Sequence, residues 1–310
     1  METRNIRADL TLLLVAAIWG FAFVAQRLGM DYLGPFGFNG SRFLLGAVSL
    51  LPLLLIFRPK PGSTEPRAML RGSVTAGIFL FLGASLQQAG LLWTSAGNAG
   101  FITGLYIIIV PLMGLLLGHV TRLNTWLGGL FAVVGLYFLT VNQSAGESFS
   151  INTGDLLVLG SAFFWAAHVI VIGKLASQLD NLRLAIIQFF ICALLSFIVA
   201  IVFEQDTLSL ANIALAWQPI AYAGLLSVGV AYTLQVVAQR DSPASHAAII
   251  MSLEAVFAAI GGWWLLAEDF SDRALIGCSL MLAGMILSQL NLFRGKESST
   301  NQAQITDSKI

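Results

Sequence analysis

The feature that most constrains this chain is a series of ten apolar stretches, each long enough to cross a lipid bilayer as a helix. A spanning helix needs about 20 mostly apolar residues, within a usual range of roughly 17 to 25. Only 10% of the 310 residues are charged, whereas soluble domains carry about 25%. The sequence therefore predicts an all-α integral membrane protein with ten transmembrane helices. Their expected ranges are 10–28, 36–57, 72–93, 97–118, 124–141, 154–173, 183–203, 217–238, 244–266 and 274–293.

The basic residues indicate how these helices are oriented. Cytoplasmic segments of membrane proteins are enriched in Lys and Arg. If the N-terminus is cytoplasmic, only Arg27 and Arg273 fall in outside segments, and Arg42 lies within a span. We therefore expect both termini in the cytoplasm and the chain in a bacterial inner (plasma) membrane. The inside segments then hold Arg4, Arg7, Arg58, Lys60, Arg67, Arg71, Arg122, Lys174, Arg183, Arg240, Arg294, Lys296 and Lys309.

The two halves of the chain resemble each other. Asp9 and Trp19 of the first stretch match Asp155 and Trp165 of the sixth at one offset. Each half holds five spans, so the second half enters the membrane from the opposite side, as in many secondary transporters. We predict two inverted five-helix repeats, 1–146 and 147–293, followed by a disordered cytoplasmic tail at 294–310. Further matches pair Gly83 with Gly229, Ala99 with Ala247, Leu105 with Leu253, Gly128 with Gly277, and Gly135 with Gly284.

Glu254 is the deepest acidic residue, near the centre of the ninth stretch. An ionisable group at this depth costs about 2.5–3.5 kcal/mol on insertion scales, so it normally faces a cavity and has a partner. Two functional roles are open: contact with a substrate amine, or proton coupling by a carboxyl group whose burial favours the protonated form. The structural alternative is a protonated glutamic acid that hydrogen-bonds a neighbouring helix.

Aromatic and polar residues recur at helical spacing along several stretches, and such stripes place them on one helix face. Aromatic rings beside a few amides suit a mostly apolar pocket for a small solute. The structural alternatives are interhelical hydrogen bonds for the glutamines, packing for the tryptophans and a satisfied interior position for the histidine. Arg42 has two interpretations, a clamp for a substrate carboxylate or a structural residue whose stem reaches the outer interface, and the structural one is preferred. The candidate substrate-binding or coupling residues are Glu254, Trp19, Gln26, Gln88, Tyr106, Trp165, His168, Tyr232 and Gln235.

Four segments carry a family resemblance: AAIWGFAFVAQRLG, the Arg42-Phe43 pair, TSAGNAGFITGLYIIIVPL and SLEAVFAAIGGWWLLAE. They resemble the drug/metabolite transporter superfamily, EamA branch, and the resemblance extends over about 8–293. It implies a 5+5 inverted fold, small-molecule transport and a cavity lined chiefly by the first, third, fourth, sixth, eighth and ninth helices. Family members commonly read Leu-Glu-Pro in the ninth helix, whereas this chain reads Leu253-Glu254-Ala255. A proline kink is therefore expected at Pro111 in the fourth helix rather than in the ninth.

These features favour a secondary transporter that works by alternating access. The expected solutes are small metabolites such as amino acids or drug-like amphipathic compounds, and the resemblance leans towards export. A channel-like facilitator is the first alternative, although the sequence contains no recognisable selectivity filter or ring of charged residues. A membrane-embedded enzyme is the second, but the three histidines lack catalytic spacing, so no enzymatic activity is expected.

Partners and cofactors follow from the same sequence. The chain has no nucleotide-binding P-loop, and we expect no cofactor and no metal site, with protons as the candidate coupling ion. A net charge of zero argues against binding of nucleic acid. The expected partners are the solute and the lipid bilayer, with the protein a monomer or homodimer. Substrate identity and transport direction are left open by the sequence.

Overall fold

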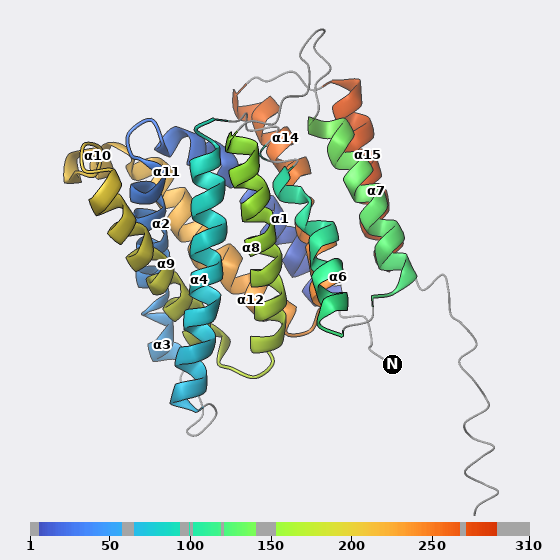
Figure 1. The fold of residues 1–310 in the computed structure, drawn as a ribbon, viewed down its shortest axis with the longest axis horizontal. Helices are drawn as coiled ribbons and strands as arrows, with labels where there is room; N and C mark the ends of the chain where they lie inside the picture. The colour runs from blue at the N-terminus through green and yellow to red at the C-terminus, as the bar shows by residue number, and fades with distance from the viewer. Residues whose placement is uncertain are drawn as a thin grey trace, which may run out of the picture.

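The structure is a computed structural model, and its described residues are 6–57, 65–93, 99, 102–118, 121–140, 153–266 and 271–289. Every regular element within these residues is a helix, which confirms the all-α prediction for them (Figure 1). The first half contains α1 (Ile6–Gly29), α2 (Pro35–Leu50), α3 (Leu53–Ile56), α4 (Pro66–Gly90), α6 (Tyr106–Leu116) and α7 (Leu123–Thr140). The second half contains α8 (Thr153–Leu175), α9 (Asn181–Phe203), α10 (Leu210–Leu215), α11 (Trp217–Ala221), the π-helix η1 (Tyr222–Tyr232), α12 (Thr233–Gln239), α13 (Ala244–Met251), α14 (Glu254–Leu266) and α15 (Asp272–Gln289).

Each of the ten predicted stretches coincides with a helical segment. Seven segments in the described part of the chain are long and apolar enough to cross a membrane. The fourth and fifth stretches contain shorter apolar helices, Ile102–Leu116 and Leu123–Phe138, and the tenth contains α15. The structure therefore describes a bundle with at least seven apolar helices of spanning length. The predicted tail at 294–310 lies outside the described residues.

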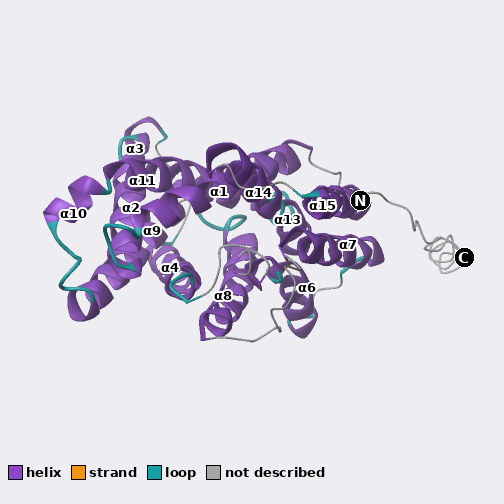
Figure 2. Cartoon of the chain, turned by 90° about the horizontal axis from the view of Figure 1, so that it is seen from above, coloured by secondary structure: helices purple, strands orange, loops and turns teal. Residues whose placement is uncertain are grey.

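The helices pack mainly against partners that are distant in sequence. Extensive contacts join α7 to α15, α2 to α9 and α4 to α8, and α1 packs against both α14 and η1. Seen from above, α1 and α14 lie near the middle of the molecule, with α7 and α15 at one side and α9 and α10 at the other (Figure 2). The central position of α1 matters because its second half carries several of the candidate site residues.

Glycines on α7 and α15 allow these two helices to approach closely. A Cβ atom at Gly135 would lie 2.6 Å from the carbonyl oxygen of Gly277, and one at Gly128 would lie 2.6 Å from that of Gly284. Small residues of this kind permit backbone contact where hydrophobicity cannot drive helix association. The two matched pairs therefore share one contact in a crossed arrangement, in which Gly128 faces Gly284 and Gly135 faces Gly277.

The start of α2 is held by a side chain from the end of α9. Pro35 occupies the first turn of α2, where a missing N–H costs nothing. The backbone N–H groups of Phe36 and Gly37 donate to the two carboxylate oxygens of Glu204, at 3.0 and 2.7 Å. A negative charge is favourable at a helix N-terminus. Glu204 therefore fixes α2 against α9 at this end of the bundle.

Candidate substrate cavity

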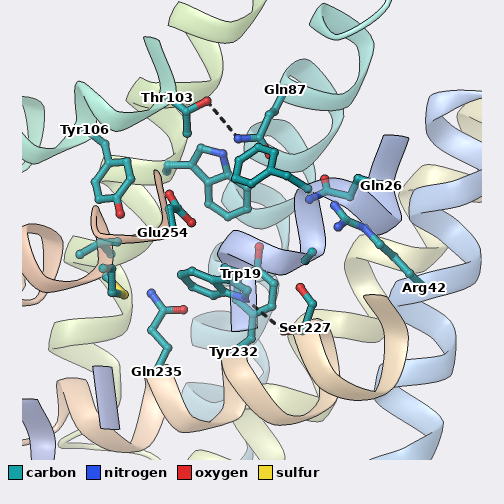
Figure 3. Close-up of a pocket in the computed structure, with 15 residues that line it drawn as sticks. Trp19, Gln26, Arg42, Gln87, Thr103, Tyr106, Ser227, Tyr232, Gln235 and Glu254 are labelled. Carbon is teal, nitrogen blue, oxygen red and sulfur yellow. Dashed lines mark hydrogen bonds between the residues drawn. The ribbon is translucent and has the colours of Figure 1, made fainter. Parts of the chain in front are cut away.

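A cavity lies between the helices and offers about 520 Å³ of empty space, including its open mouth. Only about 40 Å³ of this space is free for the centre of a water-sized molecule. The cavity in this conformation therefore holds a few water molecules, and an organic solute enters only when the lining side chains or helices move apart. Its lining comes from α1, α2, α4, α8, η1, α12 and the interrupted segments 102–116 and 244–266 (Figure 3). The lining residues are Trp19, Ala22, Phe23, Gln26, Arg42, Gln87, Thr103, Tyr106, Trp165, Val169, Ser227, Tyr232, Gln235, Met251 and Glu254.

The cavity brings together all but two of the residues predicted from the sequence. All six helices implied by the family resemblance contribute, and α2 adds a seventh through Arg42. Whether these side chains bind a substrate stays a prediction, since their position alone does not assign a role. The predicted residues that line the cavity are Trp19, Gln26, Tyr106, Trp165, Tyr232, Gln235 and Glu254.

Gln88 and His168 are the two predicted residues that do not line the cavity. Gln88 is fully buried, and its side-chain amide donates to the backbone oxygen of Gln26 at 3.5 Å. His168 is also fully buried, with Nε2 at 3.0 Å from Oε1 of Gln188. The Gln88 contact matches the structural alternative, an interhelical hydrogen bond. His168 makes one such bond, but its Nδ1 has no hydrogen-bond partner among the described residues. The neighbouring Gln87 takes the expected place on the cavity wall.

Arg42 is the most important lining residue that the sequence interpretation placed elsewhere. Its side chain does not reach an outer interface; the residue is 2% exposed and lines the cavity. The reason is tertiary, because α2 packs against η1 and α9 rather than standing at the edge of the bundle. The only signal in the sequence was the presence of a charged residue within an apolar span.

Three aromatic rings form a continuous wall of the cavity. The Tyr232 ring centroid lies 4.5 Å from that of Trp19 and 6.1 Å from that of Trp165, which it meets in a stacked arrangement. Gly83 leaves room for Trp165, since a Cβ atom there would lie 3.1 Å from the indole. Aromatic rings supply large apolar contact area with defined geometry, so this wall suits the apolar part of a solute.

The π-helix η1 shapes one side of this wall. π-helical turns are rare and occur frequently at functional sites. Ser227 lies within η1, and its backbone oxygen accepts a hydrogen bond from the indole Nε1 of Trp19 at 3.2 Å. The hydroxyl of Tyr222, also in η1, donates to the backbone oxygen of Ile18 at 3.1 Å. These two bonds fix the Trp19 region of α1 against η1, a feature that side-chain patterns in the sequence could not reveal.

Two helices are interrupted at matching positions beside the cavity. α13 ends at Met251 and α14 begins at Glu254, and α6 begins at Tyr106 directly after a turn at Leu105. Tyr106 and Glu254 are thus the first residues of the two resumed helices. Pro111 lies inside α6, which continues through it, so the kink expected there stays a prediction; the structure adds a break at Leu105. The ninth helix breaks although it has no proline there.

Interrupted helices at a central cavity are typical of transporters, because the freed backbone lines a polar space. Gly20 brings α1 directly against the second break, since a Cβ atom there would lie 2.6 Å from the Glu254 carbonyl oxygen. Glu254 and Tyr106 lie side by side on the cavity wall (Figure 3). Within the described residues, no group of three or more His, Cys, Asp or Glu side chains is arranged to hold a metal ion.

Comparison with known proteins places this architecture in a family. The chain matches the EamA-like transporter family over residues 6–141 and again over 152–290. An uncharacterized transporter of Archaeoglobus fulgidus is 32% identical over 294 residues, covering 93% of this chain and 88% of the relative. The S-adenosylmethionine/S-adenosylhomocysteine transporter of Chlamydia muridarum is 25% identical over 292 residues, covering 90% of each chain.

A solved crystal structure shares the fold, with a TM-score of 0.77 over 94% of this chain and 99% of the other at 18% sequence identity. The relatives are named as transporters rather than as enzymes. The family match extends over nearly the whole chain, and the apolar helices make it a multi-pass integral membrane protein. The resemblance drawn from the sequence motifs is thereby confirmed, and the chain belongs to the EamA-like transporter family.

Proposed function

We propose that this protein is a secondary transporter that exports small metabolites, such as amino acids or drug-like amphipathic solutes, by alternating access. The observation that carries the proposal is the cavity between two interrupted helices, with a carboxylate at one break and a tyrosine at the matching position of the other. The named activity of the chlamydial relatives, transport of S-adenosylmethionine and S-adenosylhomocysteine, adds these two compounds to the candidate solutes.

The inverted repeat is part of this proposal, with boundaries at 1–146 and 147–293. In the predicted repeat, α1 corresponds to α8, α2 to α9, and α4 to η1 together with α12. Helix contacts support the repeat because they occur in corresponding pairs. The contact of α4 with α8 corresponds to that of η1 and α12 with α1, and the contact of α4 with α9 corresponds to that of η1 with α2. The family model also matches once in each half of the chain. Two such halves rock about a site at their interface and expose it to either side in turn.

The proposed topology has ten spans with both termini in the cytoplasm of a bacterial cell. Seven helices of spanning length support it, together with the three shorter helical segments that coincide with the remaining predicted stretches. The distribution of Lys and Arg supports the orientation. In this topology α1 runs outward from its first residues, so Asp9 lies near the inner face and Gln26 nearer the outer face.

A contact between α1 and α13 is proposed to close the cavity at its inner end. Nε2 of His246 lies 3.0 Å from Oδ1 of Asp9, and the two side chains are only 17% and 9% exposed. Buried apolar side chains fill the space between this contact and the cavity, among them Leu12, Val15 and Ile250. In this proposal the contact closes the inner end of the cavity, and its release accompanies inward opening.

Cross-linking tests this gate. In a variant with Cys192 and Cys278 replaced by alanine, we expect Asp9→Cys/His246→Cys to form a disulfide and to lose at least nine-tenths of its solute exchange on oxidation. Exchange should return on reduction, because only the oxidised form is locked. The single-cysteine variants, oxidised in the same way, are the control. Full exchange by the completely cross-linked protein would show that this contact does not open during transport.

Reconstitution into liposomes tests the function itself. We expect uptake of a radiolabelled amino acid or S-adenosylmethionine to saturate and to accelerate when the same solute is present on the other side. Trans-acceleration is the signature of a carrier that returns faster when loaded. A current that rises linearly with ion concentration, without exchange, would contradict the proposal and favour the channel alternative.

A further inference from the structure

We infer that Arg42 is an anion-binding subsite of the cavity, and that the solutes which fit best are zwitterions carrying a carboxylate for Arg42 and a cationic group for Glu254. The inference rests on the proposed transport function and specifies its substrate class. Four properties carry it: the burial of Arg42, its lack of an internal counter-charge, the fixed geometry of its guanidinium group, and the position of Glu254 in the same cavity.

Arg42 is a buried cation without a carboxylate partner. It is 2% exposed, and no salt bridge joins it to any residue in the described part of the chain. A charge removed from water is costly unless an opposite charge and hydrogen bonds compensate it. The guanidinium group is always protonated, so it cannot avoid this cost by losing a proton. The missing counter-charge therefore points to a ligand that enters the cavity.

The surroundings of Arg42 hold the guanidinium group in one orientation. Its Nε donates to Oδ1 of Asn39 at 2.9 Å, and the Asn39 amide in turn donates to the backbone oxygen of Ala84 at 3.2 Å. The guanidinium carbon lies 5.0 Å from the ring centroid of Phe43 and 5.7 Å from that of Phe38. A planar guanidinium group fixed in this way is suited to a carboxylate, which accepts two parallel hydrogen bonds.

The terminal nitrogens of Arg42 are the donors left for a ligand. The hydrogen bond of the residue within the described chain uses Nε. In Figure 3 the guanidinium end of Arg42 is directed toward Gln26 on the cavity wall. Gln26 is 5% exposed, and its Oε1 atom has no hydrogen-bond partner among the described residues. The terminal nitrogens of Arg42 thus lie beside the Gln26 side chain on the cavity wall, where the carboxylate of a solute would accept from the guanidinium group.

Glu254 supplies the opposite charge on another part of the same wall. It lies beside Tyr106 and is placed across the view from Arg42 in Figure 3, with aromatic rings between them. No described basic residue forms a salt bridge with it. A solute with only a cationic group would leave Arg42 uncompensated, and one with only an anionic group would do the same to Glu254. A zwitterion with an apolar or aromatic body satisfies both charges and the rings.

Matched pairs of compounds test the inference. Phenylalanine and S-adenosylhomocysteine carry a carboxylate and an ammonium group; their methyl esters keep the ammonium group and lack only the carboxylate. Binding is measured as the ligand-dependent rise in thermal stability of the purified protein, since ligands of the folded state stabilise it by mass action. We expect at least one zwitterion to bind about tenfold or more tightly than its partner, as a charge-assisted hydrogen-bond pair implies.

Variants assign this preference to Arg42. Arg42→Gln should reduce the preference to less than about twofold, and Arg42→Lys should keep part of it, because the positive charge is the recognised feature. Asn39→Asp keeps the arginine but adds a carboxylate beside it, so it should also remove the preference for the solute carboxylate. This second variant decides the matter if Arg42→Gln does not fold. Arg27→Gln, at an exposed position on α1, is the matched control and should behave as the parent protein.

Three results would overturn the inference: binding of no zwitterion, equal binding of both members of each pair, or equal weakening of both members in Arg42→Gln and Asn39→Asp. The last would indicate a purely structural arginine. The proposed transport function fails separately, if the zwitterion binds with the expected preference but is not exchanged across liposomes. Conversely, saturable exchange without preference for the carboxylate would support the proposed transport function and contradict the proposed anion-binding subsite.

Discussion

Glu254→Gln is expected to lower solute exchange at least tenfold and to remove its dependence on pH. Glu254 begins α14 at the interruption of the ninth span and lines the cavity beside Tyr106. A glutamine has nearly the same size but neither binds a proton nor attracts an ammonium group. Removing one charge-assisted contact costs about 1.5–3 kcal/mol, or roughly tenfold to a hundredfold in affinity. The measurement is exchange in proteoliposomes from acidic to alkaline pH.

The matched control for this variant is Glu65→Gln, which removes an acidic group at an exposed position before α4. Its exchange should follow that of the parent protein at every pH. Full exchange by Glu254→Gln at all pH values would exclude both functional roles and leave the structural one. A lower exchange rate that keeps the parent pH dependence would favour contact with a substrate amine and assign the coupling to another group.

Gly135→Ala is expected to destabilise the protein by about 1–3 kcal/mol, the usual cost of overpacking. The added Cβ atom would lie 2.6 Å from the backbone oxygen of Gly277 and 2.8 Å from the backbone nitrogen of Met281. Neither backbone atom moves without shifting α15 as a whole. The measurement is the thermal midpoint of the purified protein in detergent, with the fraction that stays monodisperse after heating.

Gly160→Ala on α8 is the control for this prediction. A Cβ atom there would meet the Leu86 side chain at 3.5 Å, which is ordinary van der Waals contact. Alanine also has a higher helix propensity than glycine by about 1 kcal/mol, so the midpoint should stay the same or rise. If Gly135→Ala and Gly160→Ala gave equal midpoints, close approach of α7 and α15 would not limit stability.

Much of the fold could be predicted because burial in lipid leaves a strong pattern. A span needs an unbroken apolar run, and the ten runs coincide with helical segments in the structure. An internal duplication could be predicted in the same way, because matched residues such as Gly135 and Gly284 recur at consistent offsets. Glu254 could be singled out because an acid at that depth is expensive unless it faces a cavity.

The rotation of each helix about its axis was the part that the sequence left undetermined. Gln87 and Gln88 are adjacent, so the sequence does not decide which of them faces the cavity. In the structure only Gln87 lines it. His168 follows Trp165 at helical spacing, yet it turns to Gln188 on α9. An apolar helix in lipid carries polar groups too sparsely to define its inward face, because its lipid-facing and protein-facing sides are similarly apolar.

By itself, the sequence determined the membrane class, the helical architecture and the family, and it singled out Glu254 as a candidate, because these depend on runs of residues and on single costly charges. Only the tertiary structure decided that Arg42 faces the same cavity as Glu254, and that the ninth helix breaks before Glu254 without a proline. The first depends on the packing of α2 against η1 and α9, and the second on backbone geometry. The first arises from contacts between residues distant along the chain, which no local pattern records.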